Sequence, residues 1–248
     1  MTPMSLIFTV AFVVVVAFIS MWQKLDLERD LLIGSVRAAV QLIVVGYVLF
    51  WVFKVESWLA MIAMVAVMVI VATQNAAKRG RGLPSIHWHV LVAIVASEVA
   101  TMGLMLALRI IPPTPRYVIS ISGMVIGSAM VVAGLLLNRL QSEMASRRGE
   151  VEVWLALGAS PRQAAGDVLK SAVKASMIPS VDALKTVGLV QLPGMMTGQI
   201  LAGASPIQAV HYQILIMYSL AASAAVCSIT LGRLSLPLFF NRDAQLVR

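Results

Sequence analysis

One ionisable residue of this sequence could do chemistry inside a membrane. Glu98 lies ten residues into a long apolar run that begins at Trp88. An isolated charge in hydrocarbon is unfavourable, so a carboxyl group at that depth must be protonated, face water or meet a cation. No basic residue is evident at the depth of Glu98. We therefore predict that Glu98 faces a path for a cation or a proton.

Other charges lie closer to the ends of apolar runs. Arg37 is about one turn into a second apolar run and is followed one turn later by Gln41, whereas Asp182 and Lys185 precede another run. We expect Arg37 and Asp182 at the same inner depth. They either pair to hold two helices together or belong, with Gln41 and Lys185, to the translocation path.

The stretch GLVQLPGMMTGQILAG, residues 188–203, mixes apolar residues with residues that weaken helices. Gly194 and Gly198 put small residues on one helix face, where another helix can approach closely. Pro193 removes a helical hydrogen bond and frees a carbonyl group, which at membrane depth is tolerated only beside protein or water. We expect a close helix contact, a broken helix that hinges during transport, or both.

Thioether groups are a further candidate set, because the chain has 15 methionines. Met102, Met105, Met195 and Met196 could bind a soft metal, although methionine is also ordinary filler in apolar helices. An iron site of oxygen ligands would use Glu98 and chain carbonyls. The histidines lack the spacing of a zinc site. The sequence has no G-x-x-x-x-G-K-[ST] phosphate loop, so we expect no ATP hydrolysis by this chain itself.

The composition shows which elements must hold these residues. Of the 248 residues, 60% are hydrophobic and 12% are charged, whereas soluble domains carry about 25% charged residues. The apolar runs are continuous, which predicts an all-α, multi-pass membrane protein. The formal charge of +8 is spread over short loops without a basic, aromatic stripe, so we expect no nucleic-acid partner.

Seven stretches are apolar and long enough to cross a bilayer. They are Met4–Met21, Ile33–Phe53, Trp58–Thr73, Trp88–Ile111, Tyr117–Leu137, Ala183–Ala202 and Val210–Leu231. We expect the first to be a retained span and not a signal peptide. With the N-terminus outside, 14 of the 19 Lys and Arg residues fall in inside segments and 3 in outside segments. The positive-inside rule thus predicts this orientation, for a single permease domain over 1–248.

The one sizeable loop, residues 138–180, lies inside in this topology. Gly149 and Gly158 bracket a short predicted helix, with Glu150 and Glu152 in its first turn, where negative charge complements the helix dipole. The following SPRQ sequence is a capping box that starts another helix. We predict a helix–turn–helix elbow on the cytoplasmic side.

The short helix of this elbow carries Trp154, Leu155 and Leu157 beside its carboxylates. It either lies flat on the bilayer interface or inserts its apolar side into a groove of a soluble partner. Glu152 and Gly158 are six residues apart, with alanines nearby, which resembles the E-A-A-x-x-x-G coupling loop of ABC transporter membrane subunits.

Three segments carry a closer resemblance: RAAVQLIVVGY (37–47), LALGASPRQA (155–164) and IPSVDALKTVGLVQLPGMMTGQILAG (178–203). Together they resemble the FetB-like (UPF0014) family of ABC transporter permeases, an iron-export family with plant relatives linked to aluminium tolerance. The resemblance extends from about the second span to the last.

This resemblance implies a half-transporter of the bacterial cytoplasmic membrane that forms a homodimer. Two copies of a separate ATPase subunit would bind ATP and Mg²⁺ and drive export of a metal cation. The contact with that ATPase would be made by the elbow. Its expected coupling residues are Glu150, Glu152, Trp154, Leu157, Gly158 and Ala159.

Two other classes of function stay open. An ion-coupled secondary transporter or a channel could use Glu98 as its cation or proton site and would not need the elbow. An intramembrane enzyme is disfavoured, because Ser122 and His211 are a crude serine–histidine pair from different spans, with no third group to orient the histidine.

Overall fold

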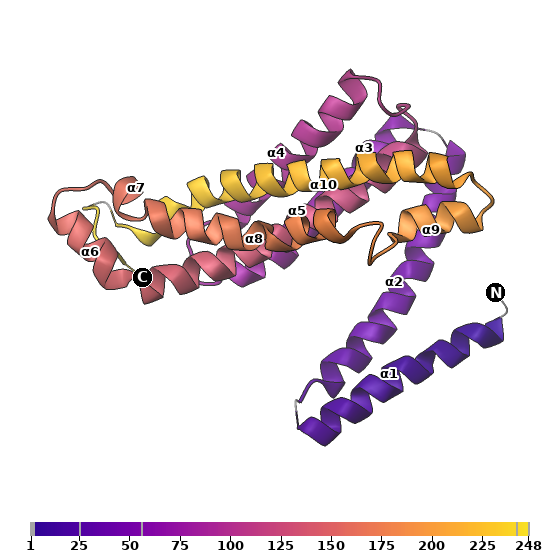
Figure 1. Cartoon of the computed structure of the whole chain (residues 1–248), viewed down its shortest axis with the longest axis horizontal. Helices are drawn as coiled ribbons and strands as arrows, with labels where there is room; N and C mark the ends of the chain where they lie inside the picture. Colours follow the sequence, from indigo (N-terminus) through magenta and orange to yellow (C-terminus); the bar gives the residue numbers. More distant parts are fainter. Residues whose placement is uncertain (1–2, 25, 56, 242, 248) are drawn as a thin grey trace. The chain divides into compact units, whose positions relative to one another are not determined.

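A computed structural model describes residues 3–24, 26–55, 57–241 and 243–247 of the chain. Among these residues the structure is helical, with two isolated bridges and no strand (Figure 1). The predicted all-α class is therefore confirmed. The chain forms two compact units, Met1–Ser57 and Trp58–Arg248, which are described separately below. The organisation as a single permease domain stays a prediction.

The first unit is a hairpin of α1 (Pro3–Gln23) and α2 (Glu28–Val55). Ser20 fixes the turn, because its Oγ donates to Glu28 Oε2 at 3.0 Å and accepts from the Leu27 N–H at 3.1 Å. Arg37 and Gln41 lie on α2 with exposed side chains.

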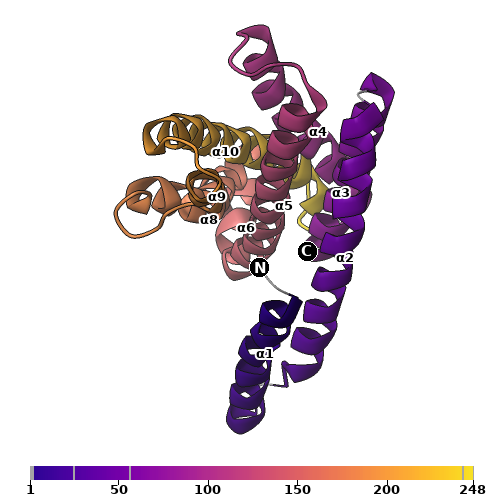
Figure 2. The same ribbon diagram turned by 90° about the vertical axis from the view of Figure 1, so that its right-hand side faces the viewer.

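The second unit is a helical bundle that carries the elbow at one end. Its elements are α3 (Trp58–Ala77), η1 (Lys78–Gly80), α4 (Ile86–Ala107), α5 (Pro115–Ser146), α6 (Arg148–Ala156), α7 (Pro161–Ala164), α8 (Gly166–Thr186), α9 (Gly194–Leu201), α10 (Pro206–Ser235) and η2 (Leu236–Phe239). Figure 2 shows α5 between α3 on one side and α8 and α10 on the other.

Five helices of the described chain are long and apolar enough to cross a bilayer. They are Glu28–Val55, Trp58–Gly80, Ile86–Ala107, Pro115–Ser146 and Pro206–Phe239. Each corresponds to one predicted span. In α1, the described apolar part is the shorter stretch Val10–Gln23. The chain is thus a multi-pass membrane protein, whereas the count of seven spans and the orientation stay predictions.

The central helix α5 extends well beyond its predicted end. The prediction ended it at Leu137, but the helix continues to Ser146 and has 32 residues, or about 48 Å of length. Hydrocarbon is about 30 Å thick. The surplus turns therefore reach past the membrane and attach the elbow directly to a spanning helix.

The predicted sixth span, Ala183–Ala202, is not one helix. Helix α8 ends at Thr186 and α9 begins only at Gly194, with an irregular turn between them. As Figure 1 shows, α8 and α9 follow one another along α10. The two helices share this passage along the bundle, so the interruption expected from proline and glycine is a real break.

Side-chain contacts show why such a passage must exist. Ser223 Oγ lies 3.4 Å from the Val125 carbonyl oxygen, and Cys227 Sγ lies 3.5 Å from that of Ala129. A step of four residues along α10 thus matches a step of four in the same direction along α5. Two consecutive long helices that run parallel require the chain between them to return along the bundle.

Gly232 allows α8 to pack against α10. A Cβ atom at this position would lie 2.6 Å from Leu169 Cδ1 and 3.5 Å from Val173 Cγ2. We expect Gly232→Val to destabilise the protein by about 1–3 kcal/mol through overpacking, measured as denaturant unfolding in detergent.

Gly127→Val is the matched control for this prediction. A Cβ atom at Gly127, on α5, would meet no described atom within 4 Å. Both variants place the same β-branched residue in a helix, so the difference between them reports packing. Equal unfolding free energies would contradict the close contact.

Candidate functional site

Glu98 lies in a groove formed by α3, α4 and α5. The groove has a volume of about 410 Å³. Apolar side chains form most of its wall, and Glu98 and Ser122 supply its polar side chains. Its lining includes Met61, Val65, Glu98, Met102, Val118 and Ser122. The helical spacing of four residues explains part of this set, since Glu98 and Met102 lie one turn apart on the same face of α4.

One oxygen of the Glu98 carboxyl group is buried without a hydrogen-bond partner. Its side chain is 8% exposed, and Oε2 makes no hydrogen bond within the described chain. The Ser122 hydroxyl lies near this carboxyl group, yet Ser122 Oγ is also buried without completing a hydrogen bond there. Nearby, Thr101 donates to the Ser97 carbonyl of its own helix at 2.7 Å. Buried polar groups without a hydrogen bond are rare in proteins. Glu98 Oε2 and Ser122 Oγ therefore indicate a site for a ligand or for water.

No ion pair with Glu98 forms among the described residues. The serine–histidine pairing considered for an enzyme is also absent from this part of the chain. Ser122 faces the groove, and its hydroxyl makes no hydrogen bond with His211.

The break between α8 and α9 is a compact turn over residues 187–193. Gly188 adopts φ +82°, and its N–H donates to the Gln191 carbonyl at 3.0 Å. The N–H groups of Leu189 and Val190 both donate to the Thr186 carbonyl. No hydrogen bond within the described chain takes up the carbonyl groups of Gly188, Leu189 and Val190. The N–H groups of residues 187–190 are therefore satisfied, whereas three carbonyl acceptors of the turn stay open.

This turn is highly exposed in the single chain. Leu189 is 89% exposed and Val190 is 84% exposed. Ala183, one turn before the break, lines a cavity with Gly127 and Met217 from the middle of α5 and α10. Since both helices are long and apolar enough to span a bilayer, we expect the turn at membrane depth. Irregular backbone at this depth is tolerated only beside protein or water. We therefore expect the turn to be covered by a second chain or to lie in an aqueous path.

The prediction that Pro193 lies inside a spanning helix is wrong. Pro193 is not inside a helix but precedes α9 as its N-cap residue. Its own carbonyl accepts hydrogen bonds from the Thr197 N–H at 3.0 Å and Thr197 Oγ1 at 3.1 Å. The carbonyl that a proline frees is that of the residue four positions earlier, which here is Leu189. The Leu189 carbonyl is one of the open acceptors of the turn before Pro193, in agreement with the freed carbonyl predicted at this proline.

The small-residue face of α9 has no close partner helix within the described chain. A Cβ atom at Gly194 or Gly198 would meet no described atom within 4 Å. Met195 and Met196, on the same helix, are half-buried. The close contact expected at these glycines is thus not made here, and the face is open to a second copy.

Asp182 and Lys185 form an exposed ion pair just before the break. Their side chains lie 3.7 Å apart and are largely exposed. Arg37 lies in the first unit, so its pairing with Asp182 stays a prediction.

The elbow has the caps that its sequence predicts. Gly158 adopts φ +88°; its N–H donates to the Leu155 carbonyl, and the Ala159 N–H donates to that of Trp154, both at 3.0 Å. This is the Schellman pattern that ends a helix at glycine. Gln163 Oε1 then accepts from the Ser160 N–H at 2.9 Å, as expected for the capping box.

One side of the elbow is buried in the bundle. Val151, Ala164 and Ala165 belong to the hydrophobic core that includes Leu140 of α5 and Phe239 of η2. Leu155, expected on the outer apolar side, packs against this core instead. Packing in this core thus holds α6 and α7 beside α5 and η2.

The other side of α6 carries an exposed apolar patch, which we call the elbow patch. It consists of Val153, Trp154 and Leu157. Trp154 is 52% exposed and Leu157 is 75% exposed. The structure thus separates the residues that hold the elbow from those that can meet a partner.

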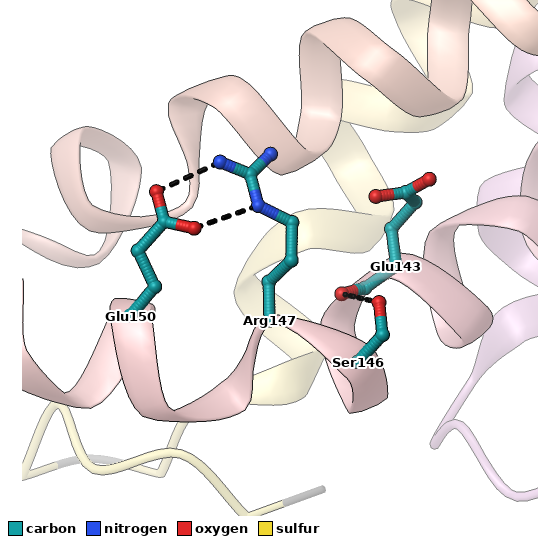
Figure 3. Close-up of polar contacts among 4 residues, drawn as sticks. All are labelled: Glu143, Ser146, Arg147 and Glu150. Atoms are coloured by element: carbon teal, nitrogen blue, oxygen red, sulfur yellow. Dashed lines mark hydrogen bonds and ion pairs between the residues drawn. The ribbon is translucent and has the colours of Figure 1, made fainter.

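Each of the two carboxylates of α6, Glu150 and Glu152, is paired with a neighbouring arginine. Arg147 Nε and Nη2 donate to Glu150 Oε2 and Oε1 at 2.8 and 2.7 Å, as Figure 3 shows. Arg148 Nε donates to Glu152 Oε1 at 2.7 Å. The hydrogen bonds with Arg147 hold the pKa of Glu150 below its ordinary value. Glu150 and Glu152 therefore stabilise α6 in the free protein, and the elbow patch offers the apolar contact.

Sequence reasoning missed Met61 and the position of Ser122 beside Glu98. Met102 lines the groove as a candidate thioether, whereas Met105 is buried outside its lining. Spacing on α4 places Glu98 and Met102 on one face, but nothing in the sequence indicates which faces of α3 and α5 meet it. Among the described residues no group of three or more His, Cys, Asp or Glu side chains could hold a metal.

Comparison with known proteins adds to this geometry. The family described as "Uncharacterised protein family (UPF0014)" matches residues 3–240. The chain is 47% identical over 246 residues to the UPF0014 membrane protein YjkA of Bacillus subtilis, with 99% of this chain and 98% of that protein covered.

Two other relatives have more informative names. The chain is 38% identical to "Probable iron export permease protein FetB" of Escherichia coli, with 99% of this chain and 95% of the relative covered. It is 39% identical to "Protein ALUMINUM SENSITIVE 3" of Arabidopsis thaliana, with 94% and 86% covered. No solved structure matches the chain.

Proposed function

Because this chain belongs to the UPF0014 family of membrane proteins, we propose that it is the permease subunit of an ABC transporter that exports metal cations. A relative in this family is named as an iron export permease. Iron is accordingly the first candidate substrate. Energy would come from a separate ATPase subunit, which would bind ATP and Mg²⁺.

The elbow is the observation that carries this proposal. Its inner side is buried in the bundle core, whereas the elbow patch stays exposed on α6. Trp154 is of the residue type that interface hot spots favour, and Val153 and Leu157 extend the apolar contact area around it. Movement of a bound ATPase would reach α8 through the elbow, and α8 ends at the break before α9.

The translocation path would be completed by a second copy of the chain. The turn over residues 187–193 and the glycine face of α9 lack cover in the single chain. A homodimer with two ATPase subunits would cover them and leave the open carbonyls facing an aqueous path. The bacterial cytoplasmic membrane is the proposed location, with the elbow in the cytoplasm.

Reconstitution tests the proposal. The purified chain is placed in proteoliposomes with and without a candidate ATPase, and Fe²⁺ movement is followed after addition of ATP and Mg²⁺. We expect ATP-dependent transport only when both proteins are present. Equal transport by the chain alone would overturn the ATPase-driven mechanism.

That negative result would favour a second candidate, an ion-coupled secondary transporter or channel. The unpartnered carboxyl group of Glu98 supports it, because such a group can carry a proton or cation across the membrane. This mechanism predicts transport driven by a pH gradient and insensitive to changes in the elbow patch.

A further inference from the structure

The Glu98 groove holds more potential ligand atoms than its single carboxyl group. Met61 of α3 and Met102 of α4 line the same groove as Glu98 and Ser122. All four side chains are at most 8% exposed. Three helices thus bring a carboxylate, a hydroxyl and two thioether groups to one cavity of about 410 Å³.

The chemistry of these groups selects among cations. Mg²⁺ and Ca²⁺ bind about six or more oxygen ligands, water included. The groove lining supplies the Glu98 and Ser122 side-chain oxygens beside apolar groups, so such an ion would have to keep most of its water in apolar surroundings. Thioether groups prefer soft ions such as Cu(I). The set therefore disfavours hard cations and favours a soft one.

Charge balance points the same way. Glu98 supplies a single negative charge, and no ion pair forms with it in the described part of the chain. A monovalent ion would leave the groove neutral, whereas an ion of higher charge would leave a net positive charge in apolar surroundings.

We propose that Glu98, Met61, Met102 and Ser122 form a transit site for a soft transition-metal cation of low charge. This inference rests on the proposed transport of metal cations and narrows its substrate class. The site prefers Ag⁺ or Cu⁺ to Fe²⁺, and Fe²⁺ to Mg²⁺. Two neutral thioethers and one carboxylate bind such an ion without completely enclosing it, so the ion can be released on the other side of the membrane.

Metal binding to the purified full chain tests the site without any ATPase. The probe is Ag⁺, because it is soft, monovalent and stable to oxidation, and bound silver is measured after desalting in detergent. Met61→Leu combined with Met102→Leu removes both sulfur atoms at nearly constant volume. We expect the affinity for Ag⁺ to fall by about tenfold or more, with thermal unfolding unchanged.

Met105→Leu is the matched control, since the chain contains 15 methionines that could bind silver unspecifically. Met105 lies on α4 and is as buried as Met102 but does not line the groove. We expect its affinity for Ag⁺ to stay as in the unmodified chain. The proposed site would be wrong if both variants lost the same affinity for Ag⁺ or if the double variant lost none. It would also be wrong if the unmodified chain bound Mg²⁺ more tightly than Ag⁺.

The experiment also separates this inference from the proposed function. If ATP-dependent Fe²⁺ transport occurs but the double variant binds Ag⁺ as tightly as the unmodified chain, the proposed site is wrong and the transporter assignment stands. If the groove binds Ag⁺ as expected but transport needs no ATPase, the site stands and the ATPase-driven mechanism is wrong.

Discussion

Glu98→Gln is expected to reduce transport roughly ten- to hundredfold while the protein stays folded. Interactions of charged groups with a partner are worth about 1.5–3 kcal/mol, which corresponds to that range. Folding should be spared, because Glu98 Oε2 makes no hydrogen bond in the described chain that the substitution could break. Initial transport rates in proteoliposomes and thermal unfolding in detergent measure the two effects.

Asp243→Asn is the control for this substitution, since Asp243 is an exposed carboxylate near the end of the described chain. It loses the same negative charge outside the groove, so transport should be unchanged. If Glu98→Gln transports as well as the control, Glu98 has a structural role and not a place on the path. Loss of folded protein in Glu98→Gln would likewise contradict an unpartnered carboxyl group.

Trp154→Ala combined with Leu157→Ala is expected to weaken ATPase binding by about thirtyfold or more. Truncation of an interface hot spot costs about 2 kcal/mol or more, and each 1.4 kcal/mol is a factor of ten. Both side chains are largely exposed, so the free protein should unfold as before. Binding is measured by titration of the ATPase onto the purified chain in nanodiscs.

Trp58→Ala is a closely matched control. Trp58 is 58% exposed and begins α3. The other end of α3 leads into η1, where a Cβ atom at Gly80 would lie 3.1 Å from Leu137 Cδ1 of α5, on the side of the bundle toward the elbow. Trp58 therefore lies at the far end of the bundle, and its truncation should leave ATPase binding unchanged. If the elbow patch only lies on the bilayer interface, the double variant will bind the ATPase normally.

Glu152 is a less suitable position than Trp154 or Leu157 for a test of ATPase binding. Charge reversal at Glu152 is suggested by the sequence resemblance, but Glu152 is paired with Arg148 at 2.7 Å. A lysine there would face Arg148 and disturb α6 itself. Trp154 and Leu157 avoid this problem, because they make the outer contact without holding the helix.

The sequence by itself determined the class of the protein, five of its spanning helices and the caps of the elbow. These features depend on near neighbours in the chain: continuous apolar runs require lipid, Gly158 ends α6, and SPRQ starts α7. Hydropathy also located the segment that is broken, although it predicted one span where two helices share the passage.

Only the tertiary structure decided which residues meet. In a membrane helix the lipid-facing and the buried side are both apolar, so periodicity does not indicate which face is inside. Met61, Ser122 and Glu98 come together because particular faces of α3, α4 and α5 pack, and Leu155 turns inward because α6 docks on the core. The open carbonyls likewise follow from the turn before Pro193, a choice of backbone hydrogen bonds that residue types alone do not fix.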